Sequence, residues 1–82
     1  MTNDDLFSLF AESLEVDAST LSPKTVIAEV PEWTSLAWLT IMSLLDERYG
    51  IQVEPRALRS FTTVAELIAY LDGKAVVRGQ QQ

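Results

Sequence analysis

The stretch that decides the fold is residues 35–49, Ser-Leu-Ala-Trp-Leu-Thr-Ile-Met-Ser-Leu-Leu-Asp-Glu-Arg-Tyr. Its apolar side chains recur every three or four residues, which predicts a helix. They form two stripes, one of Leu36, Leu39 and Met42 and another of Trp38, Ile41, Leu45 and Tyr49. A helix that is apolar over so much of its circumference is typical of a central position, packed on several sides. Gly50 follows directly, where glycine most often ends a helix.

Two segments precede this central helix. Residues from about Asn3 to Leu14 carry one apolar stripe, and Thr2 or Asn3 precedes it as a helix cap. Residues 16–34 follow as a long connection that holds two prolines and several turn-forming residues. We expect the apolar residues of this connection to attach it to the core, because so long a loop in so small a domain is functional or structured by packing.

Two further helices are predicted after Gly50. Pro55 suits the first turn of a short helix that ends near Ser60. The spacing Thr63-Val-Ala-Glu66 is that of a capping box, and it opens a last helix that we expect Gly73 to end. The pattern therefore predicts an all-α fold, a small four-helix bundle with three main helices, one short helix and a long first loop.

The length of 82 residues allows one domain. We place it at residues 1–73, followed by a flexible tail over residues 74–82, where the apolar periodicity is lost. The start at Met1 and the loose polar end favour a free-standing protein over an excised module. The acidic start, Met-Thr-Asn-Asp-Asp, lacks the positive region of a signal peptide, and the longest apolar stretch is half of what a membrane span needs.

The chain has neither cysteine nor histidine. Disulfides, thiol nucleophiles, Cys/His metal sites and a Ser-His-Asp triad are therefore excluded, and we expect neither a bound metal nor enzymatic activity. Asp46 and Glu47 are adjacent, so their side chains diverge on a helix. This arrangement favours a solvent-exposed helix face over a pair of catalytic carboxylates. A cysteine-free chain is compatible with the cytoplasm, which is the location we expect.

The net charge is −6, with −8 on residues 1–54 and +2 on residues 55–82. The negative part would repel a phosphate backbone, so nucleic acid is excluded as a partner and basic protein surfaces are favoured. We expect a monomer that has no membrane span and that serves other proteins.

Four features together resemble the acyl and peptidyl carrier protein family. Ser35-Leu36 matches the last two residues of the Asp-Ser-Leu triplet that opens the family's second helix. Asp46-Glu47 matches its acidic pair, and Tyr49-Gly50-Ile51-Gln52-Val53 matches the aromatic-Gly-Ile-x-aliphatic run that follows. The threonine-rich opening of the family's last helix is similar to residues 62–67, and the resemblance covers residues 3–71 in order.

The resemblance implies a covalent modification at Ser35. A phosphopantetheinyl transferase would move 4′-phosphopantetheine from coenzyme A to the Ser35 hydroxyl, and the thiol of that group would hold an acyl, aminoacyl or polyketide group as a thioester. Acyl-activating, condensing or acyltransferase enzymes would then use this cargo, as in fatty acid, polyketide or nonribosomal peptide biosynthesis. The alternative is that Ser35 is an ordinary helix cap. The chain would then be an unmodified carrier-like domain, acting as an interaction or regulatory module.

The chain departs from the family pattern at its expected recognition residues. Thr34 stands where the family has the aspartate that partners recognise, which leaves either an active carrier with altered recognition or an unmodified one. Ala37 and Thr40 replace acids common in fatty-acid carriers, so we expect partner contacts to be more apolar than usual. The residues that we predict for partner recognition are Thr34, Leu36, Ala37, Thr40, Asp46 and Glu47.

Two sets of apolar residues have more than one possible role. If Thr34 is the cap, Trp33 and Trp38 have the spacing of a hydrophobic staple, which we favour over contact with cargo or a partner. A second set forms the core and, in carriers of this family, can also line a cleft for acyl chains. Its members here are Leu39, Met42, Leu45, Val53, Leu58 and Val64.

Overall fold

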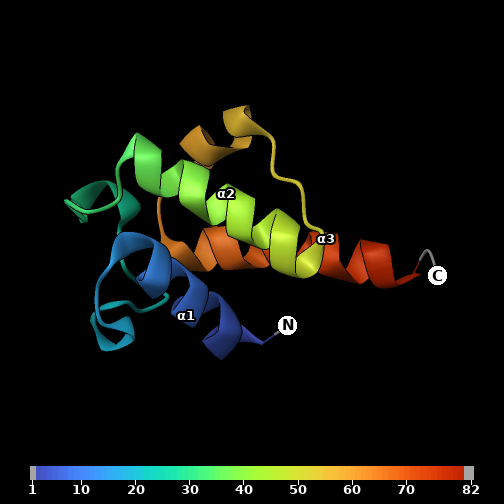
Figure 1. Ribbon diagram of the computed structural model, residues 1–82, viewed down its shortest axis with the longest axis horizontal. Helices are drawn as coiled ribbons and strands as arrows, with labels where there is room; N and C mark the ends of the chain where they lie inside the picture. The colour runs from blue at the N-terminus through green and yellow to red at the C-terminus, as the bar shows by residue number, and fades with distance from the viewer. Residues whose placement is uncertain (1, 81–82) are drawn as a thin grey trace.

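The computed structural model describes residues 2–80, and for Arg59 and residues 75–80 it describes the backbone alone. Over that range the chain is mostly helical, and the α-helices are α1 (Asn3–Leu14), α2 (Ser35–Tyr49) and α3 (Val64–Gln80). In Figure 1, α2 lies across the molecule with α1 and α3 on the same side of it. Within the described residues, three 3₁₀ helices occupy the connections, η1 (Ala18–Thr20), η2 (Ile27–Glu29) and η3 (Pro55–Ser60).

The core lies where the three α-helices meet. Helix α1 contributes Leu6, Leu9, Phe10 and Leu14, all spaced on one face as its apolar periodicity predicts. Helix α2 contributes a narrow stripe of Ala37, Ile41 and Leu45, and α3 contributes Val64, Leu67, Ile68 and Leu71. Every buried residue among the described side chains is apolar, so hydrophobic burial is the main stabilising term of this domain.

Polar residues fix the start of each α-helix. Thr2 and Asp5 form a full capping box on α1, and the hydrogen bond from the Thr2 N–H lowers the pKa of the Asp5 carboxyl. At α3 the Thr63 hydroxyl accepts from the Glu66 N–H at 3.3 Å, as predicted. The Glu66 carboxylate, however, accepts from Thr62 rather than from Thr63, so the reciprocal bond lies one residue earlier than in a capping box.

The long connection between α1 and α2 is attached to the first turn of α3. The Ile27 N–H donates to the Thr62 carbonyl, the Val64 N–H to Thr25 and the Ala65 N–H to Pro23, at 2.9, 3.0 and 2.9 Å. Leu21 and Ile27 are buried, as expected for a connection that packs on the core. These hydrogen bonds hold the middle of the connection beside the start of α3.

One expectation about an element end is corrected. Helix α3 does not stop at Gly73 but continues to Gln80, and Lys74, the first residue of the expected tail, places its ammonium 5.2 Å from the centroid of the Tyr70 ring. A Cβ at Gly73 would meet nothing within 4 Å, so no steric contact requires glycine at this position. The short helix predicted from Pro55 to about Ser60 is present at Pro55–Ser60, as a 3₁₀ helix. Residues 81 and 82 of the expected tail lie outside the described residues, and its flexibility stays a prediction.

Candidate functional site

Ser35 is the first residue of α2, and Thr34 before it is the cap. The Thr34 hydroxyl accepts from the Ala37 N–H at 3.2 Å, which satisfies one of the donors that a helix start leaves free. The side chain of Ser35 is exposed, and its hydroxyl makes no hydrogen bond with any residue that the structure describes. The interpretation of Ser35 as an ordinary cap is therefore wrong, because Thr34 performs that role.

A hydrophobic staple holds the backbone at this point. Trp33, directly before the cap, is only 8% exposed, and its ring centroid lies 5.1 Å from that of Trp38 in the first turn of α2. Phe10 of α1 extends the cluster, at 5.7 Å from Trp33. These contacts confirm the predicted staple, and they fix the angle at which the chain enters α2. Ser35 thus stands on rigid backbone while its side chain faces solvent.

The first turn of α2 also presents backbone donors. Within the described residues, the N–H groups of Ser35 and Leu36 have no hydrogen-bond partner. These groups and the positive end of the helix dipole favour an anion at this position by roughly 0.3–1 kcal/mol. A phosphodiester on Ser35 is therefore compatible with its surroundings. The described residues hold no group of acidic side chains that could bind a metal ion.

An open apolar groove of about 410 Å³ begins at Ser35. Its walls come from α2 on one side and η3 on the other, and they consist of Ser35, Trp38, Leu39, Met42, Pro55 and Leu58. Trp38 therefore belongs both to the staple and to the wall of this groove. Pro55 was expected only as a helix start, and no pattern in the sequence indicated that η3 folds over α2.

The comparison with known families shows the family of the chain. A profile of the family described as phosphopantetheine attachment site matches residues 4–71. The chain belongs to this carrier family. Its prosthetic group is 4′-phosphopantetheine, and domains of this family generally act as carriers that interact with a phosphopantetheinyl transferase and with partner enzymes. No curated protein and no solved structure matches the chain in the corresponding comparisons.

The residues expected to line an acyl cleft in this carrier are divided among three environments. Leu39, Met42 and Leu58 lie together in the groove beside Ser35. Leu45 and Val64 are fully buried in the core and do not line that groove. Val53 is buried at the edge of a separate hollow of about 370 Å³ that it shares with Met42 and Asp46. A cleft role thus stays a prediction for all six residues, of which the structure places Leu45 and Val64 in the core rather than in the groove.

The expected recognition residues of the carrier are mostly at its surface. Thr34, Thr40, Asp46 and Glu47 are exposed, and Leu36 is 72% exposed. Ala37 differs, because it is 6% exposed and packs in the core stripe of α2. Its side chain is therefore unavailable to a partner, and its role at this position is to pack in the core.

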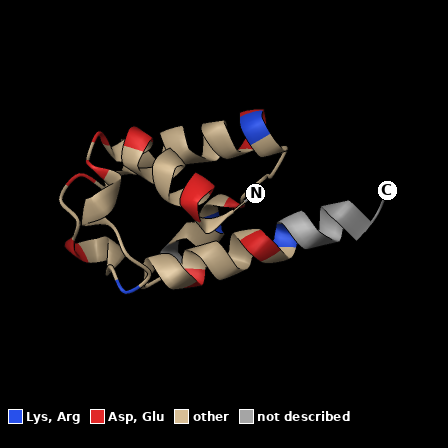
Figure 2. Cartoon of the chain, turned by 90° about the horizontal axis from the view of Figure 1, so that it is seen from below, with Lys and Arg blue, Asp and Glu red and all other residues tan. Residues whose placement is uncertain are grey.

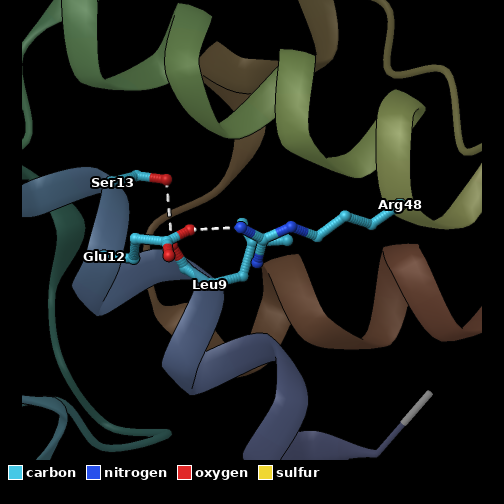
Figure 3. Close-up of polar contacts among 4 residues, drawn as sticks. All are labelled: Leu9, Glu12, Ser13 and Arg48. Carbon is cyan, nitrogen blue, oxygen red and sulfur yellow. Dashed lines mark hydrogen bonds and ion pairs between the residues drawn. The ribbon is translucent and has the colours of Figure 1, made fainter.

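Arg48 is directed away from the acidic pair that precedes it in the carrier. Its guanidinium donates to the Glu12 carboxylate of α1 at 2.6 Å, which is the ion pair drawn in Figure 3. Both side chains are exposed, so the pair stabilises the fold by about 1 kcal/mol at most. It does place the positive charge over α1, and Asp46 and Glu47 keep their negative charge at the surface. Over the described residues as a whole, acidic positions outnumber basic ones (Figure 2).

None of the described helices is long and apolar enough to cross a membrane.

Proposed function

We propose that this protein carries acyl, aminoacyl or polyketide intermediates on a 4′-phosphopantetheine group attached to Ser35. The observation that supports the proposal is the position of Ser35 at the start of a helix held by the staple, inside the region that matches the family. Its side chain is exposed and has no hydrogen-bond partner among the described residues. When bound, the group supplies a thiol that holds its cargo as a thioester. Catalysis would come from partner enzymes, since domains of this family are generally non-catalytic carriers.

The residues around Ser35 would serve the attachment in distinct ways. The N–H groups of Ser35 and Leu36, which have no partner among the residues that the structure describes, would face the phosphodiester, and Thr34 would keep the helix start intact beneath it. Leu39, Met42 and Leu58 would contact an apolar cargo in the groove. We infer that η3, which forms the far wall of the groove, takes the place of the short helix in a four-helix carrier. We also propose that the protein is located in the cytoplasm.

The test is the intact mass of the purified chain after coexpression with a broad-specificity phosphopantetheinyl transferase. We expect a gain of one phosphopantetheine group that disappears in Ser35→Ala. Ser43→Ala is the matched control, since Ser43 is an exposed serine two turns further along the same helix, and it should keep the gain. A gain that persists in Ser35→Ala would refute the attachment site. If every transferase that is tried leaves the protein unmodified, the result would instead support an interaction module. Thr34, which stands in place of the family's aspartate, is the residue that suggests this alternative.

A further inference from the structure

The indole N–H of Trp33 is buried, and it has no hydrogen-bond partner among the described residues. The side chain is 8% exposed and its ring contacts those of Phe10 and Trp38. A buried tryptophan usually finds a partner for its N–H, because an unpaired buried donor destabilises the fold. The staple requires only an apolar ring at this position, so the indole nitrogen needs a separate explanation.

Trp33 is held firmly in place. Its backbone N–H donates to the Val30 carbonyl at 3.0 Å, and the N–H of Thr34, the next residue, donates to the Glu32 carbonyl at 3.0 Å. The ring packs against Phe10 of α1, with 5.7 Å between the two centroids. The unpaired donor is therefore a fixed group that stands two residues before Ser35.

Trp38 has more freedom than Trp33. It is half-buried, and its ring contacts Trp33 and also lines the groove that begins at Ser35. Trp33 itself does not line that groove. Because the groove is open and measures about 410 Å³, the Trp38 ring has room to change rotamer on that side. Such a change would bring the Trp33 N–H to the groove.

The remaining walls of the groove are poor in hydrogen-bond donors. Leu39, Met42, Pro55 and Leu58 carry no donor on their side chains, and Pro55 has no backbone N–H either. The 4′-phosphopantetheine arm contains amide carbonyls, and a carbonyl that leaves water for such a groove loses its hydrogen bonds. An acceptor that needs a donor would thus lie one ring away from a donor that needs an acceptor.

We infer that Trp33 is a binding residue for the prosthetic group, and that its indole N–H donates to an amide carbonyl of the arm once the Trp38 ring has turned aside. This inference rests on the proposed function. The phosphodiester is the less suitable acceptor, because the N–H groups of Ser35 and Leu36 are the donors closest to the attachment point. The contact holds the arm along the groove, and it requires no cargo on the thiol.

The first experiment records the indole signals in the proton–nitrogen correlation spectrum of the isotope-labelled chain, before and after modification of Ser35. The chain has two tryptophans, so Trp38→Phe leaves one signal and assigns it to Trp33. The Trp33 proton should move downfield on modification, as a proton does when it enters a hydrogen bond, and by more than the Trp38 proton. Ser35→Ala treated with the same transferase is the control, and its spectrum should stay unchanged.

The second experiment compares unfolding midpoints of the modified and unmodified chain. Modification should raise the midpoint of wild type by about 4 °C or more, because it pairs a buried donor. In Trp33→Phe the rise should be less than half as large, and the loss of packing cancels because both forms share it. Tyr70→Phe is the matched control, since it removes a polar group from an aromatic ring of α3 that packs on Phe61, and it should keep the full rise.

Three results would overturn the inference. The first is a Trp33 signal that does not move although the intact mass shows the modification. The second is a shift confined to the Trp38 signal, which would assign the contact to the N–H of Trp38. The third is an equal rise of the midpoint in Trp33→Phe and wild type. Failure of the proposed function has a different signature, since the wild-type chain would then gain no mass with any transferase.

Discussion

Replacement of Thr34 tests both the start of α2 and the departure from the family pattern. The Thr34 hydroxyl accepts from the Ala37 N–H at 3.2 Å, and no other side chain among the described residues caps this helix. Thr34→Ala removes that acceptor, which typically costs about 1 kcal/mol. For a domain of this size such a loss lowers the unfolding midpoint by about 4–8 °C.

Aspartate and asparagine at the same position separate capping from charge. Both side chains cap at least as well as threonine, but only the aspartate would add a negative charge at the positive end of the helix dipole. Thr34→Asp should therefore exceed Thr34→Asn in stability by about 0.3–1 kcal/mol, or about 1–8 °C, and salt should reduce the difference. If the carboxylate also matters to the transferase, Thr34→Asp will be modified faster than wild type and Thr34→Asn will not.

The assays are thermal unfolding by far-ultraviolet circular dichroism, at low and high salt, and the rate of mass gain with the transferase. A Thr34→Ala protein that unfolds at the wild-type temperature would refute the assignment of Thr34 as the cap. Equal midpoints for the aspartate and asparagine variants at low salt would refute the dipole argument while leaving the cap intact.

Two further predictions concern the other α-helices. Gly73→Ala should stabilise the protein by about 0.5–1 kcal/mol, because the helix continues through Gly73 and the added Cβ meets nothing within 4 Å. Thermal unfolding measures this change, and a midpoint below that of wild type would place the helix end at Gly73 instead. The Asp5 pKa is lowered in the fold, chiefly by the hydrogen bond from the Thr2 N–H, so its stabilising contribution is present above the ordinary carboxyl pKa and is lost as pH falls below it. Asp5→Asn should therefore be less stable than wild type at neutral pH, and denaturant titrations should show the gap closing in acid; a gap that is constant with pH would contradict the assigned shift.

Helix positions were predictable wherever a local signal determines them. The bounds of α1 and α2 agree with the apolar periodicity, the threonine caps and the stop at Gly50, all of which act within a few residues. Gly73 misled because glycine is common just after helices but is also tolerated inside one, at a cost of about 1 kcal/mol. Its backbone has no positive φ in the structure, whereas that of Gly50 does.

The buried face of α2 was not predictable in the same way. Its apolar residues surround most of the helix, so periodicity alone does not tell which stripe meets α1 and α3. The structure buries Ile41 and Leu45 and leaves Leu36 and Leu39 exposed. The groove depends on contacts between residues still further apart in the sequence. Its second wall consists of Pro55 and Leu58 of η3, which packs against α2.

The position of Ser35 one residue inside the helix has a consequence for the modification. A serine that caps a helix uses its oxygen to accept a backbone N–H, and attaching a phosphodiester there would put at risk a bond worth about 1 kcal/mol. Here Thr34 provides the cap, and the Ser35 hydroxyl is bonded to none of the described residues. Attachment at Ser35 would therefore cost the helix no hydrogen bond. A threonine at position 34, where the family resemblance has aspartate, still caps the helix, so Ser35 is not needed for that role. The difference from aspartate is the loss of a negative charge, which would interact with a partner or with the helix dipole.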